Sequence, residues 1–305
     1  MNKTRPKVGI VIVNYLNYSD TIDYIRNSIS LQEDIDPEIV IVDNASPNES
    51  FRLLTESFGA NGCVSVLSNP ENSGYAAGNN IGIRFLEKKE CDFILISNSD
   101  IFLDDKYLLI KMIKKYNQLE NVAFISPVMS VKDKVCPEFS AWKLPDRLKE
   151  ILSSTFLLRI LGSRYLARYY YKIEEGNEIC LRVDCLGGSF FLGAVDIFRR
   201  INYFDENIFL YYEETILGLK IRNNNLNNYL IQDLKYNHYQ AHTINTIFSP
   251  SEKYRMLLKS KLYYWKTYCR AGRIFLFILK FLYVFQAAEL FCISVVNKFQ
   301  KKDHK

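Results

Sequence analysis

Short apolar runs alternate with amphipathic stretches in the first 130 residues of the chain. Five of these runs, at 8–13, 38–42, 64–67, 91–97 and 122–126, are bounded by polar turn formers. Continuous apolar runs of this length are typical of strands buried on both faces of a parallel sheet. With helices between them, the βαβαβαβαβ order predicts an α/β fold, with a mostly parallel sheet and helices on both faces.

Two acidic residues stand at the expected carboxyl ends of these strands. Asp100 lies in the segment CDFILISNSDIF at 91–102, and Asp43 follows the second run. Ligands of open α/β sheets bind beyond such ends, so Asp100 is placed to hold a hard cation and a diphosphate. Asp43 is placed to accept hydrogen bonds from a ribose or a base. Each residue also has an ordinary structural interpretation, which stays open. Asp100 could belong to a turn that caps a helix starting near Asp104, and Asp43 could form an Asx turn or an N-cap.

A glycine-containing segment, NPENSGYAAGNNIG at 69–82, follows the third expected strand. Its three glycines recur every four residues, which permits close helix packing or approach to a ligand. The spacing matches neither GxGxxG nor a P-loop, and this argues against a dinucleotide or Walker-type site. The first strand is followed by NYLN at 14–17, which lacks the glycine-rich basic loop expected of a sugar-phosphate nucleotidyltransferase.

A carboxylate pair, Glu213 and Glu214, follows the aromatic segment FDENIFLYY at 204–212. A carboxylate that is partly desolvated near a like charge has a raised pKa, which suits a general base acting on a hydroxyl. The alternative is that both residues complement a helix N-terminus. His238 and His242 follow the last expected strand at 229–232, and an imidazole there is a candidate further metal ligand, with His238 favoured.

Basic residues are concentrated in two regions, although the net charge of the chain is only +5. Residues 143–172 contain seven basic and two acidic residues, and 253–305 contain twelve and two, so these regions carry +5 and +10. This distribution favours an anionic partner, either lipid headgroups or nucleic acid. Because long apolar runs interleave with the basic residues, we expect a membrane surface and no nucleic acid.

The C-terminal apolar stretch at 274–296 is long enough to cross a bilayer, but Lys280, Gln286 and Glu289 interrupt it. We therefore expect an in-plane interfacial helix rather than a spanning one, with burial against the domain as a further option. Residues 153–171 mix apolar and basic positions, and they predict either an amphipathic helix or an ordinary surface insertion. Seven cysteines without a regular framework indicate reduced thiols in a cytoplasmic protein.

Six motifs in consistent order make the chain resemble family 2 inverting glycosyltransferases, closest to rhamnosyltransferase-like members that build bacterial O-antigen and capsule chains. The motifs are IVNY at 12–15, VDNAS at 42–46, NPENSGYAAGNNIG at 69–82, SNSD at 97–100, GGSFFL at 187–192 and FDENIFLYYEE at 204–214. The resemblance implies a GT-A fold with a Rossmann-like sheet. It covers about residues 8–242 and leaves the insertion and the tail unexplained. With the charge and apolar patterns, we expect a glycosyltransferase domain at 1–250, with an acceptor-side insertion at 127–180, followed by a helical membrane-associating segment at 251–305.

The resemblance also implies roles for individual residues. The nucleotide-sugar pocket would contain Asn14, Tyr15, Asp43, Asn79 and Asn98; the metal ligands for Mg²⁺ or Mn²⁺ would be Asp100 and His238; and the base would be Glu214 or its neighbour Glu213. The chain departs from the family pattern at three positions. Asn98 replaces the first Asp of a DxD motif, Glu214 is one methylene longer than the usual Asp, and Ile216 occupies a frequent Asp position.

The expected activity is therefore an inverting transfer of a sugar from dTDP-rhamnose or a UDP-hexose to a hydroxyl of a lipid-linked oligosaccharide. The enzyme would act as a peripheral protein at the cytoplasmic face of the membrane. Two alternatives remain at this point. One is a catalytically weakened, membrane-bound nucleotide-sugar-binding protein, and the other is the sugar-phosphate nucleotidyltransferase.

Overall fold

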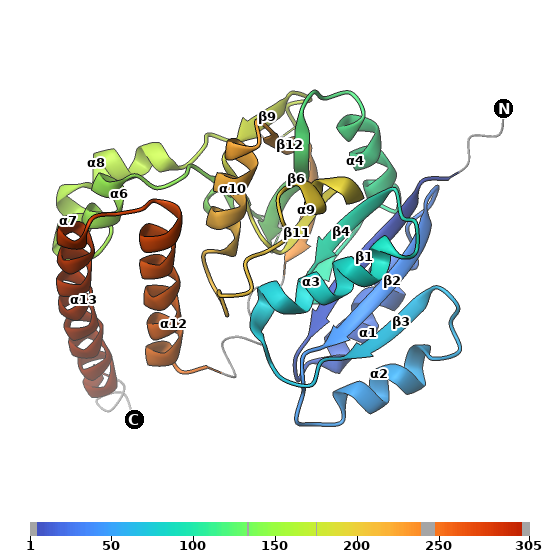
Figure 1. Cartoon of the computed structure of the whole chain (residues 1–305), viewed down its shortest axis with the longest axis horizontal. Coiled ribbons are helices and arrows are strands. Elements are labelled where there is room, and N and C mark those ends of the chain that lie inside the picture. The colour runs from blue at the N-terminus through green and yellow to red at the C-terminus, as the bar shows by residue number, and fades with distance from the viewer. Residues whose placement is uncertain (1–4, 133, 175, 239–247, 301–305) are drawn as a thin grey trace.

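A large twisted sheet covered by helices forms the body of the molecule, and a group of helices packs at one side of it (Figure 1). The computed structural model describes residues 5–132, 134–174, 176–238 and 248–300, with side chains through Glu289. His242 and the side chain of Cys292 therefore lie outside the described part. The α/β architecture expected from the alternating runs is confirmed.

The main sheet has the strand order β3-β2-β1-β4-β11-β6-β12-β5. Its strands are β1 (Lys7–Asn14), β2 (Asp36–Asp43), β3 (Val64–Ser68), β4 (Phe93–Ser97), β5 (Ile101–Phe102), β6 (Val122–Val131), β11 (Phe190–Ala194) and β12 (Asn227–His238). The pairs among β1, β2, β3 and β4 are parallel, as is β6 with β12. β11 is antiparallel to both β4 and β6, between which it lies.

Short strands extend this arrangement. β7 (Lys134–Val135) pairs with β6 and β9 (Cys180–Val183) with β12, whereas β8 (Ala141–Trp142) and β10 (Cys185–Leu186) form a separate antiparallel pair. β12 is 12 residues long, three times the expected strand at 229–232. β12 is longer than expected because it pairs in parallel with β6 and antiparallel with β9 and β5. These pairings cannot be recognised from the local sequence.

The helices fall into three groups. Those on the sheet are α1 (Tyr18–Tyr24), the π-helix η1 (Ile25–Ile29), α2 (Ser50–Phe58), α3 (Gly74–Glu87), α4 (Leu108–Tyr116), α9 (Val195–Arg200) and α10 (Glu213–Asn223). Those of the insertion are α5 (Pro137–Ser140), α6 (Arg147–Leu152), α7 (Phe156–Leu161), α8 (Ser163–Leu166) and the 3₁₀-helix η2 (Ala167–Tyr169). The C-terminal helices are α12 (Pro250–Tyr263), the π-helix η3 (Tyr264–Tyr268) and α13 (Arg273–Gln300). The segment 153–171, for which one amphipathic helix was a possible interpretation, thus forms three short helices, α7, α8 and η2.

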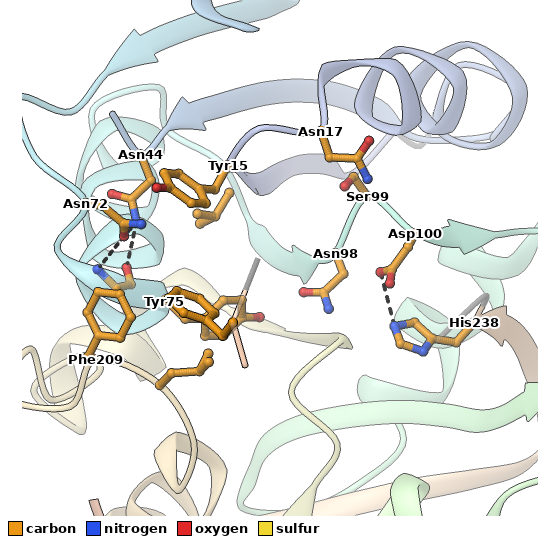
Figure 2. Close-up of a pocket in the computed structure, with 14 residues that line it drawn as sticks. Tyr15, Asn17, Asn44, Asn72, Tyr75, Asn98, Ser99, Asp100, Phe209 and His238 are labelled. Carbon is orange, nitrogen blue, oxygen red and sulfur yellow. Dashed lines mark hydrogen bonds and ion pairs between the residues drawn. The ribbon is translucent and has the colours of Figure 1, made fainter. Parts of the chain in front are cut away.

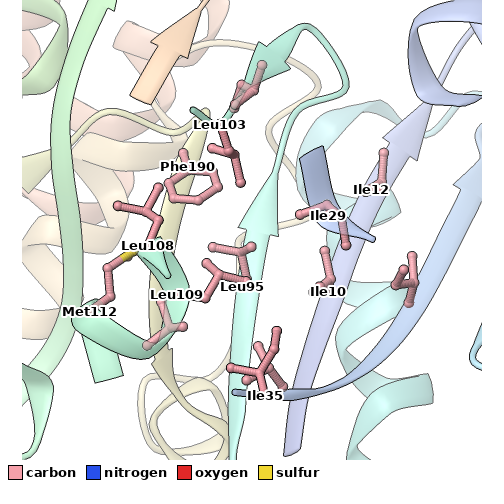
Figure 3. Close-up of a cluster of buried hydrophobic side chains, with 14 of the residues drawn as sticks. Ile10, Ile12, Ile29, Ile35, Leu95, Leu103, Leu108, Leu109, Met112 and Phe190 are labelled. Atoms are coloured by element: carbon pink, nitrogen blue, oxygen red, sulfur yellow. The ribbon is translucent and has the colours of Figure 1, made fainter. Parts of the chain in front are cut away.

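The sheet has a hydrophobic core on each face because side chains alternate along each strand. On one face Ile10, Ile12 and Leu95 pack against residues of η1 and α4, as Figure 3 shows. On the other face Val11 and Ile96 pack under α3 and α9. A third cluster joins the start of α10 to η3 and α13. This cluster fixes the C-terminal helices to the domain that carries the strand ends.

The last helix, α13, has one buried and one exposed face. Leu279 is fully buried and Tyr283 almost so, whereas Phe277 and Val284 are 71% and 69% exposed. Burial against the domain, one of the options for 274–296, therefore accounts for one side of this helix only.

Among the residues that the structure describes, no helix combines the length and apolarity needed to span a bilayer.

Candidate active site

A cavity of about 200 Å³ opens at the carboxyl ends of β1 and β4, where the sequence predicts ligand binding (Figure 2). The residues that line it are Val13, Tyr15, Asn17, Asn44, Asn72, Gly74, Tyr75, Asn98, Ser99, Asp100, Phe209, Leu210, His238 and Phe248. The predicted site residues Tyr15, Asn98, Asp100 and His238 are thus in its wall. The wall combines amide and carboxylate groups with aromatic rings, as small-molecule sites commonly do.

Asp100 and His238 meet because β5 pairs with β12, with Ile101 opposite His238. The Nε2 atom of His238 lies 3.1 Å from Oδ1 of Asp100, and both side chains are about nine-tenths buried (Figure 2). Neither ring nitrogen of His238 has a hydrogen-bond partner among the described residues, so the 3.1 Å contact lacks hydrogen-bond geometry. Two potential ligands of different type therefore face the same end of the cavity.

No group of three or more His, Cys, Asp and Glu side chains that could hold a metal ion occurs in the described ranges. Asp100 and His238 still fit a divalent cation that is shared with a substrate. Mg²⁺ is commonly held by one or two protein carboxylates, with substrate phosphates and water completing its shell. The buried imidazole of His238, whose nitrogens make no hydrogen bond among the described residues and whose Nε2 faces Asp100, is the observation that fits a missing ligand.

Asn14, Asp43 and Asn79 were expected in the pocket wall, but the structure places them behind it, each with 1% exposure. Parallel pairing sets Asn14 opposite Asp43, and Asn14 Nδ2 donates to Asp43 Oδ2 at 2.8 Å. The backbone N–H of Ser46 donates to Asp43 Oδ1 at 3.0 Å, which is the local turn considered as the alternative. Asn79 donates to the backbone oxygen of Tyr75 at 2.9 Å. These side chains hold the strand ends and the start of α3 in place.

Several wall residues were not singled out by sequence reasoning. Asn44 Nδ2 donates to Asn72 Oδ1 at 3.0 Å, and the two side chains lie beside Tyr15 at one end of the cavity (Figure 2). Phe209 and Phe248 contact edge to face, with ring centroids 6.3 Å apart. Asn44 and Phe209 lie within motifs that the sequence offered, VDNAS and FDENIFLYYEE. Phe248 carried no such signal, because its place depends on the chain's return after β12.

Gly74 allows the aromatic segment to close against the start of α3. Its φ is +89°, and a Cβ there would lie 2.3 Å from the backbone oxygen of Phe209. The same oxygen accepts a 3.0 Å hydrogen bond from the N–H of Tyr75. Only glycine allows both the left-handed conformation and this approach. The first glycine of the 69–82 segment therefore shapes the cavity, whereas Gly78 and Gly82 pack α3 against valines of the sheet.

The carboxylate pair does not line the cavity, but the Gly188 loop connects Glu214 to the wall residue Tyr75. The hydroxyl of Tyr75 donates to the backbone oxygen of Gly188 at 2.7 Å. A Cβ at Gly188 would lie 2.5 Å from Oε1 of Glu214, so this carboxylate contacts the Gly188 backbone. The N–H of Asn98 donates to Ser189, next in the chain, at 2.8 Å. One loop thus joins the Asp100 end of the site to the glutamates, which are more than a hundred residues away in sequence.

The two glutamates differ in their environments, although both begin α10. Glu213 is 5% exposed, and its Oε1 has no hydrogen-bond partner in the part of the chain that is described. Glu214 is half-buried and keeps some accessible surface. Burial raises the pKa of Glu214, partly offset by backbone N–H groups that include that of Gly188. Burial and then the charge of Glu214 raise the pKa of Glu213 well above its usual range. A raised pKa makes an ionised carboxylate a stronger proton acceptor, which suits a general base.

The backbone before the pair is strained. Tyr211 and Tyr212 have φ values of 69° and 75°, in the left-handed region that few residues other than glycine adopt. Each such residue costs on the order of 1–3 kcal/mol and persists only where the surroundings enforce it. This conformation at the N-cap of α10 decides where Glu213 and Glu214 point.

Comparison with known proteins identifies the family of the chain. The model of the family described as "Glycosyl transferase family 2" matches residues 10–201, more than half of the chain. The chain belongs to glycosyl transferase family 2. The matched region contains the strand ends with Asp43 and Asp100 and the Gly188 loop, and Glu213, Glu214 and His238 lie beyond it.

Two curated relatives match this family 2 chain in sequence. One is the low-salt glycan biosynthesis hexosyltransferase Agl10 of Haloferax volcanii, 27% identical over 72% of this chain. The other is the rhamnosyltransferase WbbL of Escherichia coli K12, 28% identical over 63% of this chain. The alignments span 63% of the length of Agl10 and 69% of that of WbbL.

Solved structures show the same GT-A fold. The mannosyltransferase PcManGT of Pyrobaculum calidifontis, in complex with GDP-Man and Mn²⁺, superposes with a TM-score of 0.59, covering 96% of this chain and 76% of its own at 12% identity. GalNAc-T7 with UDP, GalNAc and Mn²⁺ superposes with a TM-score of 0.53, covering 78% and 44% at 16% identity. At these low sequence identities, the similarity shows only that the family 2 chain shares the fold of these two proteins.

Proposed function

We propose that this chain is an inverting glycosyltransferase that moves a hexosyl or rhamnosyl group from a nucleotide sugar to an acceptor hydroxyl. The observation that carries this proposal is that the Gly188 loop connects the Glu213–Glu214 pair to the cavity that contains Asp100 and His238, because Glu214 contacts Gly188 and the wall residue Tyr75 donates to the Gly188 backbone oxygen. The names of the two relatives, a hexosyltransferase and a rhamnosyltransferase, support the class of sugar.

In the proposed reaction the acceptor hydroxyl attacks the anomeric carbon from the face opposite the diphosphate. The new C–O bond forms as the bond from that carbon to the phosphate oxygen breaks, and the nucleoside diphosphate leaves. Glu214 takes the hydroxyl proton, because its pKa is raised, the residue is only half-buried, and its carboxylate contacts Gly188 of the loop that reaches the cavity wall. Asn72 and Tyr15 offer an amide and a phenol group to the nucleotide at the other end of the cavity, and Asn44 holds Asn72 in place.

Asp100 and His238 are the residues that would hold Mg²⁺ or Mn²⁺ in this reaction. Such a cation neutralises the charge that develops on the leaving diphosphate. Two structures of similar fold have Mn²⁺ and a nucleotide or nucleotide sugar in their names, which supports the choice of cofactor.

Donor binding should depend on Asp100. With Mn²⁺ present, at least one of dTDP-rhamnose, UDP-hexoses and GDP-mannose should raise the melting temperature of the wild-type protein. The Asp100→Asn variant should bind that donor at least ~10-fold more weakly in Mn²⁺, because one anionic ligand is lost. Calorimetric titration gives the affinity, and transfer to a hydroxyl acceptor then tests the activity itself.

Asp23→Asn is the matched control for that variant. Asp23 is exposed on α1 and lines the neighbouring hollow, which shares Asp100 but not His238. It should bind the donor as the wild type does. Equal Mn²⁺-dependent binding by Asp100→Asn and wild type would contradict the assigned ligand.

We further propose that the acceptor is lipid-linked and that the protein works as a peripheral protein at the cytoplasmic face of a membrane. The exposed side of α13 carries Ile274, Phe277, Phe281 and Val284, which recur at the helical period. Lys280 and Arg273 are also exposed and fall along one edge of this stripe at 3.6 residues per turn. An apolar stripe with flanking cations suits a helix lying in the plane of an anionic bilayer.

The insertion extends this surface. The N–H of Phe156, at the start of α7, donates to Glu289 Oε2 of α13 at 2.8 Å. Phe156, Leu157 and Leu161 of α7 are 61–73% exposed. The two segments that the sequence indicated as amphipathic are therefore in contact. A second copy of this chain on the same surface would bring the exposed cations of two chains together, whereas lipid phosphates would neutralise them.

Binding to lipid vesicles should depend on this stripe. The wild-type protein should float with vesicles of phosphatidylcholine and phosphatidylglycerol at low salt and bind less at high salt, since each basic residue near such a surface contributes about 1 kcal/mol. A Phe277→Ser/Phe281→Ser variant should bind at least ~10-fold more weakly, because two large apolar groups are lost. Phe51→Ser, on α2 and 39% exposed, is the control. Absence of wild-type binding at low salt, or a dimer disrupted by the double variant, would refute the membrane proposal.

A further inference from the structure

A buried carboxylate lies where the insertion, the C-terminal helices and the start of α10 meet. Glu150 of α6 is 1% exposed. Its Oε1 accepts from Lys261 Nζ of α12 at 2.7 Å and from the hydroxyl of Tyr283 of α13 at 2.9 Å. Its Oε2 accepts from the hydroxyl of Tyr212 at 2.8 Å. Three partners, which lie 62 to 133 residues from Glu150 in sequence, thus share one carboxylate.

Stability alone does not account for this arrangement. Replacing a buried ion pair by apolar residues of similar volume is often neutral or stabilising, because both charges must be desolvated. Burial alone would raise the pKa of Glu150, but Lys261 and the two tyrosines more than offset it, so that the pKa is lowered. Glu150 is therefore held as an anion, with hydrogen bonds that fix the directions of its three partners.

Tyr212 is the partner that leads to the active site. It is the N-cap residue of α10, it has a left-handed backbone, and Glu213 and Glu214 follow it directly. The hydrogen bond to Glu150 anchors its side chain, and its ring packs edge to face on Tyr264, with centroids 5.4 Å apart. These contacts supply the surroundings that a strained residue needs in order to persist.

The preceding residues are anchored to the same helices. Ser260 of α12 donates to the backbone oxygen of Leu210 at 2.9 Å. The hydroxyls of Tyr263 and Tyr268 donate to Asp205 Oδ2 at 2.8 and 2.7 Å. The segment 204–212, which contributes Phe209 and Leu210 to the cavity wall, thus contacts the C-terminal helices at three residues, Asp205, Leu210 and Tyr212. Tyr212 is the last of these residues before Glu213 and Glu214.

We propose that Glu150 is a positioning residue for the transfer reaction: by holding the hydroxyl of Tyr212, it sets the direction in which Glu213 and Glu214 leave the start of α10. This inference rests on the proposed function, in which Glu214 is the base. It gives the insertion and the C-terminal helices a role in catalysis besides binding a membrane.

The matched pair Tyr212→Phe and Tyr283→Phe separates positioning from a purely structural role. Each substitution removes one hydroxyl that donates to Glu150 and keeps the ring. Only Tyr212 adjoins the glutamates in sequence. Both substitutions should therefore lower the melting temperature by a similar amount, whereas only Tyr212→Phe should change the positions of Glu213 and Glu214.

Steady-state kinetics provide the first readout. Tyr212→Phe should lower kcat by about 10- to 100-fold, because displacing a catalytic group by about 1 Å costs this much. The KM for the nucleotide sugar should stay within about twofold, since the nucleotide end of the cavity is unchanged. Tyr283→Phe should keep the wild-type kcat. Equal kcat losses in the two variants, or none in Tyr212→Phe, would overturn the inference.

Carboxyl titration provides a second readout that does not need activity. In protein labelled with ¹³C at glutamate carboxyls, the signals of the pair are assigned with Glu213→Gln and Glu214→Gln. Their pKa values should fall towards the ordinary glutamate range in Tyr212→Phe, as the pair gains water, and stay raised in Tyr283→Phe. Wild-type titration in Tyr212→Phe would overturn the positioning role. A wild-type protein that transfers no sugar would instead refute the proposed function, and the titration would still decide the role of Glu150.

Discussion

Replacing Glu214 by Gln should lower the rate of sugar transfer by about 10²- to 10⁴-fold, the usual contribution of a positioned base. The amide keeps the shape that fits against Gly188 but cannot take the acceptor proton. The KM for the donor should change little, because Glu214 does not line the nucleotide end of the cavity. Initial rates with saturating donor and acceptor measure the loss.

The pH dependence of the wild-type enzyme gives a second test of this assignment. Burial raises the pKa of Glu214, and the base must be ionised to act. The rate should therefore fall as the pH is lowered through this raised pKa, at a pH above the ordinary glutamate pKa of about 4.3. Glu214→Gln should lack this dependence in its residual rate.

Glu213→Gln is the comparison that decides between the two carboxylates. Glu213 is the more deeply buried, and its Oε1 has no hydrogen-bond partner among the described residues. The Glu213→Gln variant should therefore retain most of the transfer rate. A larger loss in Glu213→Gln than in Glu214→Gln would assign the base to Glu213.

Replacing Lys261 by Met should destabilise the protein by about 3–5 kcal/mol, because it leaves the Glu150 carboxylate buried without its counter-charge. The side chains of Lys261 and Glu150 are 13% and 2% exposed, so water cannot replace the lost partner. Urea unfolding followed by circular dichroism measures the change. Lys259→Met, an exposed position on the same helix, should stay within about 0.5 kcal/mol of the wild type.

As the pH is lowered, the contribution of Glu150 to the free energy of unfolding should change in opposite directions in the wild type and in Lys261→Met. In the wild type the folded-state pKa of Glu150 is lowered, so its stabilising contribution is present above the unfolded pKa and is lost as the pH falls through the folded value. In Lys261→Met the desolvation of Glu150 is no longer offset by a charge, and its pKa should be raised. The variant should therefore become more stable when the pH is lowered through that raised value. A variant with wild-type stability at neutral pH would show that the ion pair contributes nothing to folding.

The sequence by itself determined the fold class and one edge of the site. Apolar runs that end in Asn14-Tyr15, Asp43 and Asn98-Ser99-Asp100 are local patterns, and parallel strands bring such ends to one edge of a sheet. The expectation for Asp100 needed nothing more, whereas Tyr15 and Asn98 were expected from the family resemblance, and all three are in the cavity wall. The motifs likewise sufficed to place the chain in its family.

Tertiary structure decided which side chains face the cavity and which are behind it. The register of β1 and β2 sets Asn14 opposite Asp43, where the two side chains bond to each other, are buried, and do not line the cavity. Glu214 approaches the site only because β11 pairs antiparallel with β4, with Phe190 opposite Ser97, which brings the Gly188 loop beside Asn98. Pairings between strands so far apart in the chain leave no trace in local periodicity.

The role of Glu150 depended on tertiary structure entirely. In sequence Glu150 is one acidic residue in a short insertion helix, with nothing to distinguish it from a solvated surface residue. Its partners Lys261, Tyr212 and Tyr283 come from three other helical segments, and only their packing removes the water that would otherwise solvate the charge. The strength and direction of a buried carboxylate's hydrogen bonds depend on such desolvation, which is a property of the assembled fold and not of any stretch of the chain.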